Sequence, residues 1–341
     1  SGASVLPASS GACSASASAS ALLPLAVGPA ISASRGREDS VGLSEGLLMF
    51  VATLVAQGSL GQGDIAEAAD RVAEAGAQVS ARPEIEPGKA ADILFEGDAK
   101  AVRAALQALP GPVDVIVQPH ATREKKLLVA DMDSTMITIE CIDELADYAG
   151  IKPQIAEVTE RAMRGELDFA EALRARVALL AGLDEAMIER CRAERVKLMP
   201  GAKALIRTLR SRGCHTVLVS GGFTRFAEPV AADIGFHKVV ANVLDIAGGA
   251  LRGTVQQPIV DSARKQAELE QALGQLGLDP ALSIAIGDGA NDIPMIEAAG
   301  LGVAYHAKEK TRAAADAEIR YGDLSTLLYA QGIARKDWVS E

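Results

Sequence analysis

Three short apolar runs, each followed by polar residues, constrain the fold of this chain more than any other feature. They cover residues 127–130, 216–219 and 283–286. Runs of this length are typical of buried strands. Strands and helical patterns alternate beyond residue 125, which predicts a parallel sheet with helices on both faces. The polar residues after each strand would lie at the carboxyl edge, where such sheets bind ligands.

The first run ends in Asp131-Met132-Asp133-Ser134-Thr135, which places two carboxylates two residues apart. Asp131 at this edge can act as a nucleophile toward phosphorus. Asp133 can transfer protons, and the two together can hold a hard cation through oxygen. The alternative is a strand that runs into an ordinary Asx or Ser/Thr turn.

Three later signals bear on that choice. Residues 220–222, Ser-Gly-Gly, place a hydroxyl before glycines whose N–H groups can approach an anion. The alternative is an ordinary strand-to-helix turn, which has the same sequence pattern. Lys265 begins a helical pattern, where a lone lysine is normally a solvated surface charge. Residues 287–292, Gly-Asp-Gly-Ala-Asn-Asp, form a candidate half-site for Mg²⁺. Their alternative is a tight turn with an Asp helix cap.

The rest of the chain divides into segments with distinct patterns. Residues 1–46 are predicted to be a disordered Ala/Ser-rich tail, because residues 1–34 contain no charged side chain. Residues 47–122 follow the order β-α-β-β-α-β, which predicts a ferredoxin-like unit. This unit could bind a ligand or act only as a structural or dimerising appendage. Residues 141–199 are almost wholly helical and predict a cap, and residues 243–255 predict a β-hairpin.

Composition excludes several classes of function. The net charge of −11 argues against nucleic-acid binding, which requires a basic face. The four cysteines are scattered without a CxxC pair, which favours a reducing cytoplasm over a disulfide framework or zinc site. No apolar run reaches the roughly 18 residues of a membrane span. We therefore expect neither nucleic acid nor membrane as a partner.

In order and character, the four motifs resemble those of the haloacid dehalogenase superfamily of phosphotransferases, over about residues 125–317. Segments 140–146, 162–166 and 174–180 are similar to the phosphoserine phosphatase family within it. The N-terminal unit resembles ACT-type domains. The resemblance implies an α/β fold with a Rossmann-type parallel core, a helical cap at about 141–199 and an ACT-like α+β domain. The expected boundaries are 1–46, 47–122 and 123–341.

The resemblance also assigns the catalytic and metal-binding residues. Asp131 would attack phosphorus, and Asp133 would first donate and then accept a proton, which requires a moderately raised pKa. Mg²⁺ would be held by Asp131, the backbone carbonyl of Asp133, and Asp288. Asp292 would support this group without binding the metal directly.

The phosphoryl oxygens would be bound by Ser220, the backbone N–H of Gly221, and Lys265. These groups can stabilise the charge that spreads over the oxygens in the transition state. Asn291 would donate to the phosphate or orient Lys265.

The cap would select the substrate. Glu140 would meet an ammonium group, and Arg176 would bind a carboxylate through its planar fork. Met163 and Phe169 would form an apolar wall. The alternative for Glu140 is an acid favoured by a helix N-terminus, and for Arg176 a surface cation.

The expected activity is Mg²⁺-dependent hydrolysis of O-phospho-L-serine in serine biosynthesis, by a cytoplasmic enzyme that could be a homodimer. One alternative is a related phosphatase or phosphotransferase that acts on another small phosphomonoester. A second is a catalytically silent amino-acid sensor.

Overall fold

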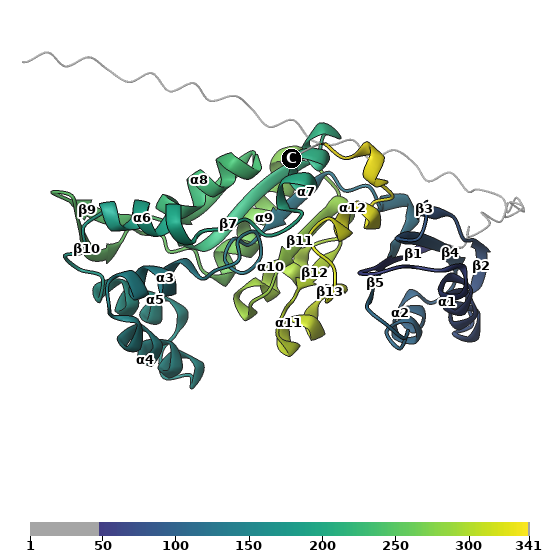
Figure 1. The fold of residues 1–341 in the computed structure, drawn as a ribbon, viewed down its shortest axis with the longest axis horizontal. Coiled ribbons are helices and arrows are strands. Elements are labelled where there is room, and N and C mark those ends of the chain that lie inside the picture. Colours follow the sequence, from purple (N-terminus) through teal and green to yellow (C-terminus); the bar gives the residue numbers. More distant parts are fainter. Residues whose placement is uncertain (1–47, 340–341) are drawn as a thin grey trace, which may run out of the picture. The chain divides into compact units, whose positions relative to one another are not determined.

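The computed structural model describes residues 48–339, apart from the side chain of Met163 (Figure 1). The tail predicted at residues 1–46 therefore lies outside the described residues. None of the described helices is long and apolar enough to span a membrane.

The part of the chain from residue 123 on, which we call the catalytic part because it carries the predicted motifs, is built on a parallel sheet of six strands in the order β13-β12-β11-β6-β7-β8. The strands are β6 (Leu127–Ala130), β7 (His215–Phe223), β8 (Lys238–Asn242), β11 (Ser283–Gly287), β12 (Gly302–Tyr305) and β13 (Ala317–Ile319). The three apolar runs form β6, β7 and β11, next to one another, so the predicted parallel sheet is confirmed.

Strand β7 is longer than the run predicted at residues 216–219. It continues through the glycines at 221 and 222 to Phe223, so the alternative of an ordinary turn at these glycines is wrong. The pairing of β7 with β8 shifts register between Val219 and Phe223. The strand therefore becomes irregular at the glycines instead of ending there, because glycine tolerates the local change in backbone direction.

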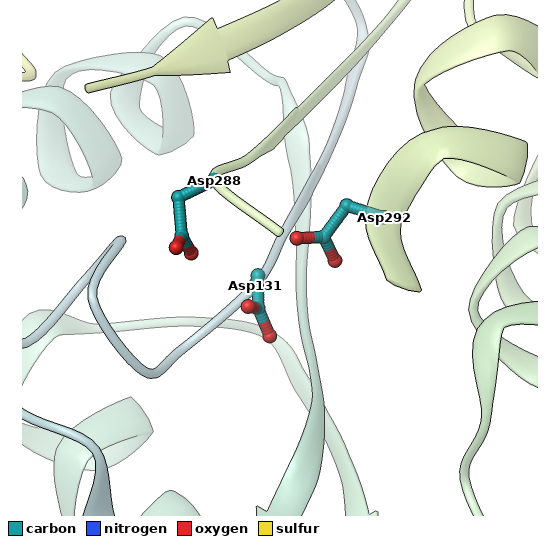
Figure 2. Close-up of side chains that lie close together, drawn as sticks. All are labelled: Asp131, Asp288 and Asp292. Carbon is teal, nitrogen blue, oxygen red and sulfur yellow. The ribbon is translucent and has the colours of Figure 1, made fainter. Parts of the chain in front are cut away.

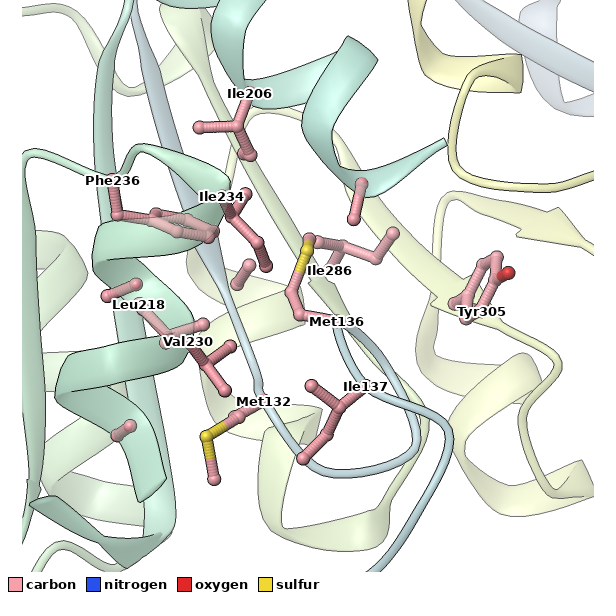
Figure 3. Packing of buried hydrophobic residues seen from close by; sticks show 14 of the residues in the cluster. Met132, Met136, Ile137, Ile206, Leu218, Val230, Ile234, Phe236, Ile286 and Tyr305 are labelled. Carbon is pink, nitrogen blue, oxygen red and sulfur yellow. The ribbon is translucent and has the colours of Figure 1, made fainter. Parts of the chain in front are cut away.

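Helices cover both faces of the sheet because successive side chains of each strand point to opposite sides. They are α7 (Ala202–Ser211), α8 (Thr224–Ile234), α9 (Ser262–Leu276), α10 (Ile293–Ala298), α11 (Glu309–Ala314) and α12 (Thr326–Ala330). Leu128 and Ala130 pack into the cluster that contains α7 and α8, part of which is drawn in Figure 3. Leu127 and Val129 pack into the opposite cluster with α9 and α10. Strand β6 is thus buried on both faces.

The predicted helical insertion follows β6. It contains α3 (Cys141–Tyr148), α4 (Lys152–Met163), α5 (Phe169–Ala178) and α6 (Ala186–Arg195), which we call the cap. The two linkers that join the cap to the core pair with each other, through a bridge between Ile137 and Leu198 and a bond from Met199 N–H to the Met136 carbonyl (2.9 Å). The predicted hairpin, β9 (Leu244–Ala247) and β10 (Ala250–Val255), is confirmed and packs against α5.

The N-terminal unit is an antiparallel sheet in the order β2-β4-β1-β5, with β3 also paired to β4. Its elements are β1 (Met49–Ala56), α1 (Gln62–Glu74), β2 (Gln78–Ala81), β3 (Glu84–Glu86), β4 (Ala90–Glu96), α2 (Ala99–Leu106) and β5 (Val113–Pro119). The order agrees with the predicted ferredoxin-like pattern, except that the second strand is split into β2 and β3. The domain boundaries and the ACT likeness stay predictions.

One face of this N-terminal sheet packs against α1 and α2, and the other face contacts the catalytic part. On that second face the guanidinium of Arg123 donates to Asp92, with Nη1 2.7 Å from Oδ2. On the edge strand β5, the carboxylate of Asp114 accepts three backbone N–H bonds from residues 320–322. Buried charge-assisted bonds of this kind hold the two sheets in a defined contact.

Candidate active site

Asp131 and Lys265 form the centre of the site. Asp131 follows β6, and only 6% of its surface is exposed. Lys265 lies in the first turn of α9, whose N-terminus is capped by the Asp261 carboxylate. Its Nζ donates to Oδ1 of Asp131 (2.6 Å) and to Oδ1 of Asp292 (2.7 Å), and the side chain is fully buried. The alternative interpretation of Lys265 as a solvated surface charge is therefore wrong.

Three carboxylates lie close together here, those of Asp131, Asp288 and Asp292 (Figure 2). One oxygen from each lies within 4.8 Å of the others. Asp288 Oδ1 also accepts from the Thr135 hydroxyl (3.1 Å), and Asp292 Oδ2 accepts from the Gly289 N–H (3.0 Å). An all-oxygen set of this kind suits a hard divalent cation.

Burial and mutual repulsion dominate the electrostatics of this group. Burial, followed by the charge of Asp292, raises the pKa of Asp131 well above its ordinary value, against the opposing charge of Lys265. The same two causes raise the pKa of Asp288 to about 6. Burial alone would lower the pKa of Lys265, but Asp131 and Asp292 raise it above its ordinary value. Lys265 is therefore a permanent cation between two acids.

Asp133 has the properties expected of a proton carrier. Its Oδ1 is buried and has no hydrogen-bond partner among the described residues. Burial, followed by the charge of Glu140, raises its pKa to about 7. The raised pKa predicted from the sequence is confirmed, so both protonation states of Asp133 are populated near neutral pH.

The loop at the end of β7 lies beside Asp133. The Ser220 hydroxyl accepts from the Gly222 N–H (2.8 Å). A Cβ at Gly222 would lie 3.0 Å from the Ser220 Oγ and 3.2 Å from the Asp133 Oδ2, so any larger residue would require both polar groups to shift. Ser220 and Asp133 therefore lie on the same side of the carboxyl edge.

Asn242 supports this loop and was missed in the sequence analysis. Its Nδ2 donates to the Gly221 carbonyl (2.8 Å), and its Oδ1 accepts from the Val260 N–H (2.8 Å). Its partners are main-chain groups, which leave no motif in the sequence. By contrast, Lys265 is oriented by the bonds that it donates to two carboxylates. The predicted alternative, in which Asn291 orients Lys265, is therefore not needed.

The cap covers the same loop. A Cβ at Gly221 would lie 3.1 Å from the Cζ of Phe169, so the Phe169 ring at the start of α5 is packed over the glycine. Of the two residues predicted to form an apolar wall, Phe169 therefore lies at the site. The side chain of the other, Met163, lies outside the described part of the chain.

Glu140 and Arg176 are close enough for the charge of Glu140 to act on the Arg176 guanidinium. Arg176 is partly buried and forms no ion pair within residues 48–339, and its Nε donates only to the Ala172 carbonyl (3.3 Å). Burial lowers its pKa, and the charges of Asp143 and Glu140 oppose that effect. Glu140 is exposed, and its Oε1 accepts from the Ser134 hydroxyl (2.7 Å). Arg176 is thus a cation without an ion-pair partner among residues 48–339, within range of the charges of Asp143 and Glu140.

The chain is similar to known hydrolases throughout this region. Residues 128–297 match the family of haloacid dehalogenase-like hydrolases. The fold and the site define a member of this class.

Two relatives and one solved structure narrow the class. The chain is 47% identical over 225 residues to a phosphoserine phosphatase of Mycobacterium tuberculosis, which is 65% of this chain and 55% of the relative. It therefore spans about half the length of that relative. It is also 47% identical over 225 residues to a phosphoserine phosphatase of Polaromonas sp., which is 64% of this chain and 95% of the relative.

A crystal structure of a probable phosphoserine phosphatase from Vibrio cholerae matches with a TM-score of 0.67 and 34% identity. The match covers 83% of this chain and 88% of that one. The chain belongs to the phosphoserine phosphatase family, as the sequence motifs predicted.

The carboxylate cluster leads to a prediction about stability without metal. Because the pKa of Asp288 is higher in the folded than in the unfolded protein, the ionised form of Asp288 destabilises the fold. This loss of stability is absent below about pH 4 and complete above about pH 6. For Asp288→Asn in EDTA, we expect the free energy of unfolding at pH 7.5 to rise by up to about 3 kcal/mol. The measurement is urea denaturation at pH 4 and pH 7.5.

At pH 4 the Asp288→Asn variant should match the unsubstituted protein. Asp70→Asn, at an exposed position of α1, is the control and should change neither value. A loss of stability in Asp288→Asn at pH 7.5 would contradict this account of the cluster.

Proposed function

We propose that this protein hydrolyses O-phospho-L-serine to L-serine and phosphate through a phosphoryl group carried on Asp131. The observation that carries the proposal is a single constellation: a buried carboxylate held by Lys265 lies beside Asp133, under a cap that presents Glu140 and Arg176. The names of the relatives, phosphoserine phosphatases, support the choice of substrate.

The proposed reaction has two displacements. In the first, an oxygen of Asp131 bonds to phosphorus and the bond from phosphorus to the serine oxygen breaks, while Asp133 gives its proton to the leaving oxygen. In the second, Asp133 takes a proton from water, whose oxygen bonds to phosphorus and releases Asp131. A group with a pKa of about 7 can serve both steps at neutral pH.

The negative charge on the phosphoryl group would be stabilised by hydrogen-bond donors and a cation that are already in position. Lys265 supplies a fixed cation, and Ser220 and the Gly221 N–H supply donors at the end of β7. Asn242 holds the neighbouring peptide, between residues 221 and 222, through the Gly221 carbonyl. Preorganised donors in a buried site stabilise a developing charge without further rearrangement. We also propose that Asn291 donates to the phosphate.

The carboxylates fit Mg²⁺, and we propose that Asp131, the backbone carbonyl of Asp133, and Asp288 hold it. Bound there, Mg²⁺ would reduce the repulsion between the Asp131 carboxylate and the phosphate dianion. Both oxygens of Asp292 already accept hydrogen bonds, one from Lys265 and one from the Gly289 N–H. This fits a supporting role for Asp292.

Substrate selection would come from the pair in the cap. Phosphoserine carries an ammonium and a carboxylate, for which Glu140 and Arg176 are the matching partners. Phe169, packed over Gly221, would exclude water from the reacting end. A role in serine biosynthesis follows from this reaction, while a cytoplasmic location and a homodimer stay predictions.

Loss of the fixed cation should slow turnover strongly. For Lys265→Ala we expect a fall in kcat worth about 3–4 kcal/mol, by comparison with the loss of oxyanion donors. The measurement is phosphate release at saturating phosphoserine with excess Mg²⁺. Arg264→Ala, one residue earlier and about half exposed, is the control and should stay within about twofold of the parent rate. An unchanged kcat in Lys265→Ala would remove the residue from the site.

Substitution of the proposed nucleophile distinguishes an enzyme from a catalytically silent sensor. Asp131→Asn should abolish phosphate release because an amide cannot attack phosphorus, and it should still bind phosphoserine. Binding is measured by calorimetry and turnover by phosphate release. Asp337→Asn, an exposed position, should retain full activity. Full activity in Asp131→Asn would refute the assigned nucleophile, and no turnover in the parent protein would support the sensor.

Arg176 should favour substrates that carry a carboxylate over those that lack one. For Arg176→Ala, kcat/KM on phosphoserine should fall about 10- to 100-fold, the range of a charge-assisted bond. On phosphoethanolamine, which lacks the carboxylate, it should change little. Arg174→Ala, exposed on the same helix, serves as the control. Equal losses on both substrates would contradict the assignment, and a preference of the parent for phosphoethanolamine would favour another phosphomonoester as substrate.

A further inference from the structure

A cavity that is separate from the carboxylate cluster lies between the N-terminal sheet and the catalytic part. Its volume is about 760 Å³, within the range of small-molecule sites. Val55 and Lys89 line it from the N-terminal sheet, Met199 and Gly201 from the second cap linker, and Trp338 from the C-terminal segment. None of the proposed catalytic residues lines it.

The wall of this cavity concentrates the aromatic residues of an aromatic-poor chain. The full sequence contains four tyrosines and one tryptophan. Tyr305, Tyr321, Tyr329 and Trp338 all line the cavity. Tyr329 and Trp338 pack with ring centroids 5.1 Å apart, while Tyr321 and Trp338 are only partly buried. Rigid amphipathic rings that keep open surface in a concavity are typical of sites that bind a planar group.

The charges on the wall favour an anion. Lys89 and Arg335 line the cavity, and neither forms an ion pair within the described part of the chain. Lys89 donates to the Ala56 carbonyl, and the Arg335 guanidinium lies 6.0 Å from the centre of the Trp338 ring. The one acid on the wall, Asp323, already accepts from the Ser325 N–H (2.8 Å). The Glu86 carboxylate, at the edge of this wall, accepts from the Tyr329 hydroxyl (2.7 Å) and the Arg335 N–H (3.2 Å). The side chains of Lys89 and Arg335 therefore remain two cations without ion-pair partners among the described residues, beside aromatic rings.

Backbone strain also marks this wall. Among the described non-glycine residues, only Ser134 and His306 have positive φ, at 55° and 43°. Ser134 follows Asp133 in the candidate active site, and His306 lines the cavity between the N-terminal sheet and the catalytic part. Strained residues of this kind are held by the surrounding structure and cluster where ligands bind.

The cavity is also joined to the base of the cap. Gly201, at φ 80°, approaches the chain so closely that a Cβ there would lie 2.6 Å from the Ser325 nitrogen. The Leu324 N–H donates to the Pro200 carbonyl (3.3 Å). Two residues before Gly201, Met199 is bonded to Met136 in the first cap linker. A molecule in the cavity would therefore contact the segment about which the cap must move when substrate enters or product leaves.

We propose that this cavity binds a small anion with an aromatic ring, and that binding changes the affinity of the active site for phosphoserine through the cap linkers. The ring would pack against Trp338 and Tyr321, and the anionic group would bind Arg335 and Lys89. The second half of the proposal rests on the proposed function, and the first half does not.

Benzoate is a suitable probe, because Trp338 is the only tryptophan and its fluorescence reports on the cavity directly. We expect a saturable change in Trp338 fluorescence with benzoate, and no such change with acetate or benzyl alcohol. Arg335→Gln and Lys89→Gln should each weaken binding about tenfold or more, as expected for loss of a charge-assisted bond. Lys336→Gln, an exposed neighbour, should bind benzoate like the parent.

The activity measurement tests the coupling. Benzoate should change KM for phosphoserine at least about twofold in the parent protein and in Lys336→Gln, with a smaller change in kcat, and Arg335→Gln should lose this response. No saturable fluorescence change, or binding unaffected by both substitutions, would overturn the site. Binding without a change in KM would overturn the coupling. Benzoate binding in a protein that does not hydrolyse phosphoserine would refute the proposed function and leave the site standing.

Discussion

The buried ammonium of Lys265, held between Asp131 and Asp292, is the interaction on which the rest of the site depends. Three carboxylates with oxygens within 4.8 Å of one another would repel strongly in a buried space. Lys265 offsets part of that repulsion and lies 134 positions from Asp131 in the sequence. Its removal would leave buried charges unpaired, which costs far more than an exposed ion pair gains. Asp131 is therefore held in place by a fixed cation, as its proposed attack on phosphorus requires.

The parallel sheet explains how residues so distant in sequence come together. Strands β6, β7 and β11 are neighbours, and each delivers its functional residues at the same carboxyl edge. Because both faces of β6 are buried under helices, its position is fixed by packing on two sides. The cap follows β6 after a linker of ten residues, so Glu140, proposed to select the substrate, lies nine positions after Asp131, the proposed nucleophile. The proposed reaction and the proposed substrate selection therefore both depend on the fixed position of strand β6.

Much of this arrangement could be predicted from the sequence, since short apolar runs locate strands and the motif residues lie directly after them. The raised pKa of Asp133 followed from its expected role. The burial of Lys265 could not be predicted from the residues alone, because a lone lysine on a helix is usually solvated. Asn242 escaped detection because it bonds only to main-chain groups. The irregular end of β7 depends on its pairing with β8, a tertiary effect that local glycine signals do not encode.

The most direct test of the central claim is to detect the phosphoryl group on Asp131. The protein would be mixed with phosphoserine labelled with ³²P in the phosphate, quenched in acid within milliseconds, digested and analysed by peptide mapping. The account predicts an acid-stable, hydroxylamine-labile label on the peptide that contains Asp131, formed before free phosphate accumulates. Phosphate release in step with substrate loss and no label on the protein, or a label on another residue, would contradict it.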